Sequence, residues 1–213
     1  MVLTDLEIHA LASGECPILS PYIPETRRVC DVDVWLWREG TAISYGQGPM
    51  AYDTRLEPNF KVFRRPSWWR RIWNWFTNYY VDPKNYDEKL LVEEVHEHEL
   101  ILYPGDYALG VTVETFHMPD DVIALCVAKS TYARLGIGVN TTPVHPGFRG
   151  QVVIEFCNQG HLPVKIYTGE GFAQFIFHRS SEPCGSNYKQ RGGVYQEQSG
   201  VQKAKTARHG GLV

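Results

Sequence analysis

The segment VAKSTYARLGIGVNTTPVHPGFRGQVVIEFC, residues 127–157, is the most informative part of this chain. It begins with a Lys-Ser pair, passes through a turn rich in Pro and Gly, and ends in an apolar run. A single carboxylate, Glu155, interrupts that run. Short runs of β-branched and aromatic residues are typical of strands. Burying an ionised carboxylate in one costs several kcal/mol unless the charge is paired.

Glu155 has two interpretations. It is either a residue on the outward face of a barrel strand, or a general base whose pKa desolvation raises toward the useful range. Lys129, Ser130 and Arg134 lie close by in sequence. Two cations and a hydroxyl suit an anionic substrate and a positioned water, so they favour the second interpretation.

Composition limits the function classes. The chain has 213 residues, of which 43% are hydrophobic and 21% charged, as expected for one globular domain with at most an excursion. The net charge of -3 argues against a nucleic acid partner. The five Cys form no CxxC pair, which favours a reducing compartment. With no basic leader at the start and no long apolar run, we expect a cytoplasmic protein without membrane contact.

The order of apolar segments predicts a mainly β fold. Residues 2–13 have the spacing of a short amphipathic helix. Later segments are short and separated by turn signals at 104–105, 119–120 and 146–147. This pattern indicates a sandwich or jelly-roll-like β-barrel with few short helices. Strands are expected at 32–37, 59–63, 90–92, 99–103, 107–116, 122–129, 150–156, 162–167 and 171–178.

We divide the chain into a β domain, 1–183, and a flexible C-terminal lid or tail, 184–213. The tail is polar and Gly-rich, so it lacks the apolar residues for a core. Within the domain, RRPSWWRRIWNWFTNYY (64–80) is an excursion with four Trp and four Arg. It is either an interfacial or partner-binding element, or an insertion folded over the domain's own surface. Aromatic residues on every helical face favour the insertion.

Several metal and nucleotide motifs do not fit. His96 and His98 would share one face of a strand, but two ligands do not make a metal site. Zinc-dependent base deaminases require P-C-x-x-C, and Pro183-Cys184 lacks the second Cys. The P-loop and dinucleotide-binding glycine patterns are also missing from the sequence.

Three ordered motifs, AKSTYARLGIGVNTTP, PGFRGQVVIEFCNQG and YKQRGGVYQEQSGV, closely resemble the dCTP deaminase family. The resemblance covers most of residues 43–201 and implies a homotrimeric, dUTPase-like β fold. It also implies hydrolytic deamination of dCTP to dUTP and ammonia without zinc. Mg²⁺ is expected only on the oxygens of the nucleotide triphosphate.

The same resemblance implies roles for individual residues. Glu155 matches the catalytic carboxylate, Ser130 the residue that holds the nucleophilic water, and Arg134 an arginine that stabilises the site. Substrate-binding positions are Lys129 at the phosphates, Thr141 and Thr142 at the base edge, Phe148 at the sugar, and Tyr188 and Gln198 in the closing tail.

Two positions depart from the family pattern. His145 stands where relatives carry Asp or Glu near the deoxyribose, and Val194 replaces a phosphate-binding Lys. Lys189 and Arg191 are candidates to take over that phosphate contact. These departures leave three alternatives to a plain dCTP deaminase: a bifunctional enzyme that releases dUMP and pyrophosphate, a deaminase of a 5-modified dCTP, or a nucleotide-binding regulatory relative. A plain dUTPase is disfavoured, because His145 takes the place of its essential Asp.

Overall fold

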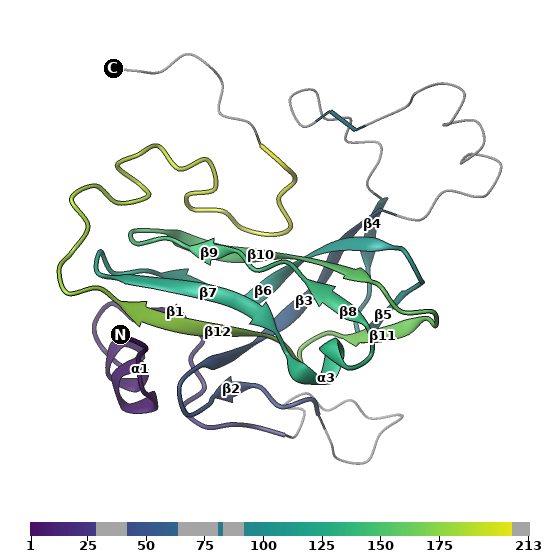
Figure 1. The fold of residues 1–213 in the computed structure, drawn as a ribbon, viewed down its shortest axis with the longest axis horizontal. Coiled ribbons are helices and arrows are strands. Elements are labelled where there is room, and N and C mark those ends of the chain that lie inside the picture. Colours follow the sequence, from purple (N-terminus) through teal and green to yellow (C-terminus); the bar gives the residue numbers. More distant parts are fainter. Residues whose placement is uncertain (29–41, 64–80, 83–91, 206–213) are drawn as a thin grey trace.

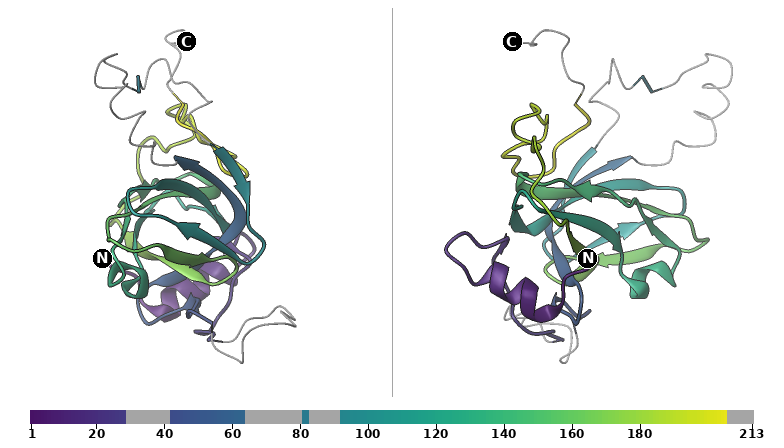
Figure 2. Two further views of the ribbon diagram at one scale, coloured as in Figure 1. Left: turned by 90° about the vertical axis from the view of Figure 1, so that its right-hand side faces the viewer. Right: turned by 60° about the vertical axis from the view of Figure 1, so that its left-hand side comes forward.

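The computed structural model describes residues 1–28, 42–63, 81–82 and 92–205. Antiparallel strands dominate these residues and form one large curled sheet (Figure 1). The two views in Figure 2 show that the sheet curls into a half-barrel. The prediction of a mainly β fold is therefore confirmed. The strand expected at 32–37, most of the one expected at 90–92 and the excursion at 64–80 lie outside the described residues.

The main path of the sheet has the order β8-β10-β6-β3-β12-β7-β9. β1 and β4 pair with β6 and β3, β2 also pairs with β3, and β5 and β11 form a separate two-stranded sheet. The strands are β1 (Leu19–Ser20), β2 (Gly46–Gln47), β3 (Tyr52–Phe63), β4 (Val92–Val95), β5 (Glu99–Leu102), β6 (Tyr107–His117), β7 (Val122–Ala128), β8 (Ile137–Val139), β9 (Pro143–Val144), β10 (Arg149–Asn158), β11 (Val164–Tyr167) and β12 (Gly171–Arg179).

Two helices accompany the strands in the described part of the chain, α1 (Asp5–Ala12) and α3 (Ser130–Ala133). Thr4 and Glu7 form a reciprocal capping box that fixes the start of α1. Ile8 on the inner face of α1 is fully buried. The predicted N-terminal helix is therefore confirmed. None of the described helices has the length and apolar run that crossing a membrane requires.

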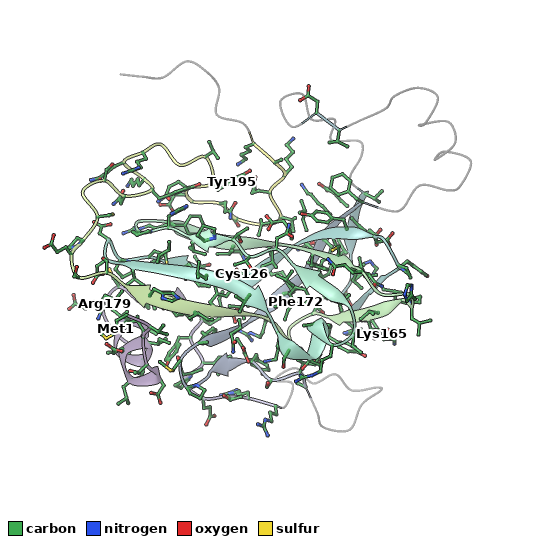
Figure 3. The ribbon with its side chains drawn as sticks, in the orientation of Figure 1. Met1, Cys126, Lys165, Phe172, Arg179 and Tyr195 are labelled. Carbon is green, nitrogen blue, oxygen red and sulfur yellow. The ribbon has the colours of Figure 1, made fainter. Side chains whose placement is uncertain are left out.

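Every second residue of a strand contributes to the buried core. In β10, Ile154 and Phe156 are fully buried, whereas Val153, Glu155 and Cys157 between and beside them are not. The ring of Phe156 packs 4.7 Å from that of Phe172, which β12 contributes (Figure 3). Alternate residues of one strand thus face opposite sides of the sheet, so Glu155 is directed away from this aromatic core.

The register of the sheet changes at Thr112 in the central strand β6. Leu56 of β3 pairs with Thr112, whereas Phe60 pairs with Gly110, so β3 is irregular between them. β10 also shifts its register on β6, between Gln151 and Val153. The Thr112 hydroxyl accepts from Val152 N (3.0 Å), and Gln151 Nε2 donates to Thr112 O (2.9 Å). These bonds satisfy the polar groups that a bulge leaves unpaired.

A buried ion pair joins β3 to β6 near this junction. Glu114 is completely buried and accepts from the backbone N (3.0 Å) and Nε (2.9 Å) of Arg55. The guanidinium of Arg55 also lies 5.1 Å from the centre of the Tyr45 ring. Burial raises the pKa of Glu114, although Arg55 beside it acts in the opposite direction. Removing one partner would therefore leave an unpaired charge in a buried position, which would raise the free energy of the folded state.

Replacing Glu114 by Ala should lower the free energy of unfolding by about 3–5 kcal/mol, because Arg55 would remain buried without its partner. The matched control is Glu93→Ala, which removes a carboxylate that pairs with Lys61 and is 76% exposed. The control should change stability by less than about 1 kcal/mol. Denaturant unfolding of both variants measures the difference, and equal effects would contradict the proposed importance of the buried pair.

Candidate active site

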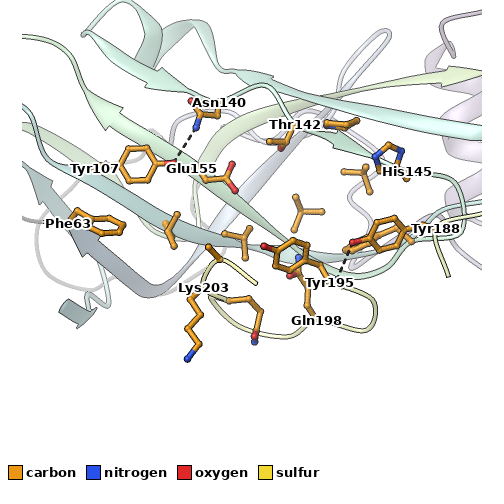
Figure 4. Close-up of a pocket in the computed structure, with 18 residues that line it drawn as sticks. Phe63, Tyr107, Asn140, Thr142, His145, Glu155, Tyr188, Tyr195, Gln198 and Lys203 are labelled. Carbon is orange, nitrogen blue, oxygen red and sulfur yellow. Dashed lines mark hydrogen bonds between the residues drawn. The ribbon is translucent and has the colours of Figure 1, made fainter. Parts of the chain in front are cut away.

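One pocket of about 670 Å³ lies between the sheet and the C-terminal tail. Strands β6, β9 and β10 and the turn before β10 form its floor, and the tail residues Tyr188, Tyr195, Gln198 and Lys203 close it (Figure 4). The surface of the walls is mainly apolar, and polar side chains from the sheet and the tail contribute to it, as is usual in sites for small molecules.

Glu155 is the sole carboxylate among the described residues that line the pocket. It lies on the face of β10 that is turned away from the aromatic core. Burial raises the pKa of its carboxyl group. Its Oε2 is buried and has no hydrogen-bond partner within the described residues. A half-buried carboxylate with a raised pKa and a free oxygen has the properties of a general base.

A second unpartnered acceptor comes from the tail. Gln198 donates from Nε2 to Gln151 O (2.7 Å), while its Oε1 is buried without a partner in the part of the chain that the structure describes. Since buried polar atoms are normally hydrogen-bonded, these two oxygens in one pocket indicate a ligand with donor groups.

An aromatic stack attaches the tail to the domain. The His145 ring is parallel to the Tyr188 ring, with centroids 5.8 Å apart, and Phe148 meets Tyr188 edge-on at 5.8 Å. Tyr188 N donates to Pro146 O (2.9 Å), and Tyr195 N donates to the Tyr188 hydroxyl (3.1 Å). His145, one of the two positions expected to depart from the family pattern, is thus part of the contact between the tail and the domain.

The tail is also joined to the first residues of β10. Gly150 forms a parallel bridge with Gln198, and Gln151 N donates to Gln198 O (3.0 Å). Gly200 N donates to Gln151 Oε1 (2.8 Å). A Cβ on Gly150, whose φ is +131°, would lie 2.6 Å from Gln198 O, so this approach requires glycine. The described tail is therefore docked on its own domain, and its mobility stays a prediction.

The structure brings together six of the residues predicted from sequence. Those that line the pocket are Glu155, Thr142, His145, Phe148, Tyr188 and Gln198. Thr141, Lys189 and Arg191 are exposed and do not line it. The prediction that Lys189 or Arg191 takes over the phosphate contact of the lysine that Val194 replaces therefore finds no support in this arrangement of the tail.

Three further predicted residues lie elsewhere. Lys129 is buried and donates to Asp53 Oδ2, whose other carboxylate oxygen accepts from Gln174 Nε2 (3.1 Å). Lys129 therefore neutralises an internal carboxylate in this chain and is not directed at the pocket. Ser130 and Arg134, at the start and the C-cap of α3, are exposed and do not line the pocket either.

Sequence reasoning missed several lining residues. Phe63 and Tyr107 meet edge-on at 5.9 Å beside Glu155, and Asn140 donates to the Tyr107 hydroxyl (3.2 Å). Tyr195 and Lys203 come from the polar tail. The aromatic residues of that tail were a usable signal, because a solvated segment has little need for them. The position of Tyr107 depends on strand pairing between distant segments and left no signal in the sequence.

The sequence's possible metal ligands do not assemble. His96 Nε2 lies 2.9 Å from Glu94 Oε2. Within the described residues, no three His, Cys, Asp or Glu side chains gather closely enough to hold an ion. The pocket likewise offers one carboxylate rather than the several oxygens that a protein-bound Mg²⁺ or Ca²⁺ would need.

Fold and pocket together define a mainly β protein with a curled half-barrel sheet and a pocket, of a size suited to small molecules, that contains a half-buried carboxylate. Residues 40–180 match the dCTP deaminase-like family. The dCTP deaminase of Acinetobacter baylyi is 46% identical over 162 residues, which cover 75% of this chain and 78% of the relative. The dCTP deaminase of Ectopseudomonas mendocina is 46% identical over 208 residues, covering 96% and 99%. The chain belongs to the dCTP deaminase family.

A solved structure shares the fold. The 2'-deoxycytidine 5'-triphosphate deaminase from Agrobacterium tumefaciens superimposes with a TM-score of 0.54 at 18% identity. The match covers 84% of this chain and 48% of that chain, so this protein corresponds to about half of the larger one. At this identity the likeness concerns the fold alone.

Gly193→Ala should release the tail. An added Cβ would lie 2.1 Å from Cε1 of the Tyr188 ring, which His145 and Phe148 hold in place. Overpacking of about 1–3 kcal/mol would increase opening of the tail by roughly 5-fold to 150-fold. Hydrogen exchange of the Tyr195 amide measures this. Gly185→Ala is the control, because nothing lies within 4 Å of its added Cβ and neither glycine has a positive φ. Equal exchange in both variants would contradict the docked arrangement.

Proposed function

We propose that this protein deaminates dCTP hydrolytically, giving dUTP and ammonia, with Glu155 as the general base. The observation that carries this proposal is the buried Oε2 of Glu155, which has no hydrogen-bond partner among the described residues, in a pocket beneath the tail. Membership of the dCTP deaminase family supplies the substrate and the reaction.

The chemistry requires one proton carrier. Glu155 accepts a proton from water as the water oxygen bonds to C4 of cytosine. It gives this proton to N3, then takes the proton of the new C4 hydroxyl and passes it to the amino group, so that the C4–N bond breaks, the C4 carbonyl forms and ammonia leaves. One water is consumed for each ammonia released. A pKa raised by burial assists both halves, because the carboxylate is a stronger base and the carboxylic acid still releases its proton readily.

The remaining lining residues suit the other parts of a nucleotide. Thr142 beside β9 would read the edge of the base, and Phe148 with His145 would contact the sugar, since all three line the pocket. Gln198 from the tail offers its free Oε1 to a donor group. Lys203 is the sole Lys or Arg in the described lining and is half-buried. We assign to it the phosphate contact that Lys129, Lys189 and Arg191 do not make in this arrangement.

Mg²⁺ would enter with the triphosphate. The lining carboxylate is needed as the base, so the phosphate oxygens and water would supply the ligands of the ion. When bound, Mg²⁺ reduces the charge of the triphosphate that the pocket must accept. The deamination itself uses no zinc in this proposal.

Ser130 and Arg134 would complete the site from a neighbouring subunit. Both belong to the family pattern, yet both lie away from the pocket of their own chain. A cyclic homotrimer would bring α3 of one subunit to the pocket of the next, as a repeated head-to-tail interface allows. The exposure of both residues supports this arrangement. We place the assembled enzyme in the cytoplasm, with dCTP as its ligand and neither nucleic acid nor membrane as a partner.

The assay is incubation with dCTP and Mg²⁺, followed by separate measurement of ammonia, dUTP and dUMP. We expect equal amounts of dUTP and ammonia, unchanged by a zinc-specific chelator. Glu155→Gln keeps the shape of the side chain but removes the base, so turnover should fall by at least about 10²–10⁴-fold. Production of dUMP and pyrophosphate would indicate the bifunctional alternative. Binding of dCTP without ammonia release would refute the proposed reaction.

Mixed trimers test the shared site. Glu155→Gln and Arg134→Ala chains should each be inactive alone. Coexpressed, they should regain activity, because about one site in four of a random mixture would receive both intact residues from adjacent subunits. The double variant, expressed by itself, is the control and should stay inactive. If the mixture shows no recovery, the two residues serve one site from one chain, and the subunit-boundary assignment is wrong.

A further inference from the structure

Two polar residues beside Glu155 have no part in the mechanism above. Tyr107 and Asn140 both line the pocket, and Asn140 Nδ2 donates to the Tyr107 hydroxyl (3.2 Å). In Figure 4 this pair lies on one side of the Glu155 carboxylate, while His145 and Tyr188 lie on the other. Asn140 also donates from its backbone N to Glu155 O (2.9 Å). The pair is thus bound to the same short stretch of β10 that carries the general base.

Strand register brings the Tyr107 side chain within reach of Glu155. β10 pairs with β6 so that Glu155 is opposite Leu109 and Cys157 is opposite Tyr107. Tyr107 is therefore the diagonal neighbour of Glu155 on one face of the sheet. Diagonal neighbours are about 7–8 Å apart, a span that an aromatic side chain and a glutamate can bridge. Phe63 packs edge-on against the Tyr107 ring and limits its movement.

The hydroxyl proton of Tyr107 and the Oε2 atom of Glu155 both lack a hydrogen-bond partner among the described residues. The Tyr107 oxygen accepts from Asn140, so its own O–H is left to donate to another group. Glu155 Oε2 is buried and has no partner among the described residues. We propose that Tyr107 is a positioning residue, whose hydroxyl donates to the Glu155 carboxylate in the working enzyme while Asn140 orients the phenol. This proposal rests on the proposed function.

The surrounding groups suit that role. Burial and, second, the charge of Glu155 raise the pKa of Tyr107, so the phenol keeps its proton in the neutral pH range. Burial raises the pKa of the Cys126 thiol in β7 to about 12, so this neighbour stays uncharged. Cys157 shares the face of Glu155 on β10, and His145 and Lys203 line the pocket from the turn before β10 and from the tail. Tyr188 and Tyr195 line the pocket from the tail, and with them these are the titratable groups among the described residues that line the pocket or adjoin Glu155.

The sign of the effect follows directly. A hydrogen bond donated to a carboxylate stabilises its charged form and lowers its pKa. Removing the Tyr107 hydroxyl should therefore raise the pKa of Glu155 further. The base works only when it is deprotonated. As the pH is lowered, the protein without the Tyr107 hydroxyl should therefore lose activity at a higher pH than the wild type.

The test is Tyr107→Phe in the full-length protein, which keeps the ring that packs on Phe63. We expect the acid limb of kcat/KM to move up by about one pH unit, so that activity on that limb falls roughly tenfold. At the alkaline plateau kcat should stay within about threefold of wild type, because the base is then deprotonated in both proteins. Asn140→Ala should move the limb in the same direction by less. A loss that is equal at every pH would mean a merely structural role and would overturn the proposal.

A second readout does not depend on turnover. Titration of the ¹³C-labelled Glu carboxyl groups by NMR, with Glu155→Gln to assign the signal, gives the pKa of Glu155 directly. The pKa should be higher in Tyr107→Phe than in wild type and unchanged in the control Tyr103→Phe, whose side chain is 52% exposed and outside the pocket. An unchanged pKa in Tyr107→Phe refutes the positioning role. A wild type that does not deaminate dCTP refutes the proposed function instead, and this titration still decides the role of Tyr107.

Discussion

The position of Glu155, the proposed general base, depends on how β10 is aligned on β6. Because side chains alternate across a strand, a slip of one residue would turn Glu155 into the aromatic core and bring Ile154 or Phe156 to the pocket. The hydrogen bonds of Thr112 and Gln151 resist such a slip, since they fit only where both neighbours of β6 change register. Gln151 also accepts from Gly200 N. The buried amide of Gln151 therefore bonds both to β6, where the register changes, and to the tail that covers the pocket.

Glu155 and Lys129 belong to one informative segment of the sequence, but the fold places their charges in different surroundings. Glu155 sits among apolar walls, which raise its pKa and leave an oxygen free. Lys129, by contrast, is used internally with Asp53. If Lys129 faced the pocket of its own chain, its charge would lower the pKa of Glu155 and weaken the base. Keeping this ammonium paired with Asp53 preserves the basicity that the proposed role of Glu155 needs.

Much of the fold and part of the site could be predicted from the sequence. The period-two pattern identified the strands, and the isolated carboxylate in an apolar run identified Glu155. Contacts between residues that are far apart in sequence could not be predicted. Lys129 and Asp53 are far apart in sequence, and nothing in their local context shows that they meet. Tyr107 lies beside Glu155 only because β6 and β10 pair in one particular register. The residues of α3 are a further case, since their predicted role needs a second copy of the chain.

The bridge between Gly150 and Gln198 has a consequence for handling the protein. The start of β10 is hydrogen-bonded to β6 on one side, and on the other side to the tail. The tail thus covers a strand edge that would otherwise present unpaired backbone groups. Exposed edges of this kind are templates for association with other chains. A preparation whose tail has been clipped by a protease should therefore precipitate more readily than intact protein, and a ligand that holds the tail down should act as a solubiliser.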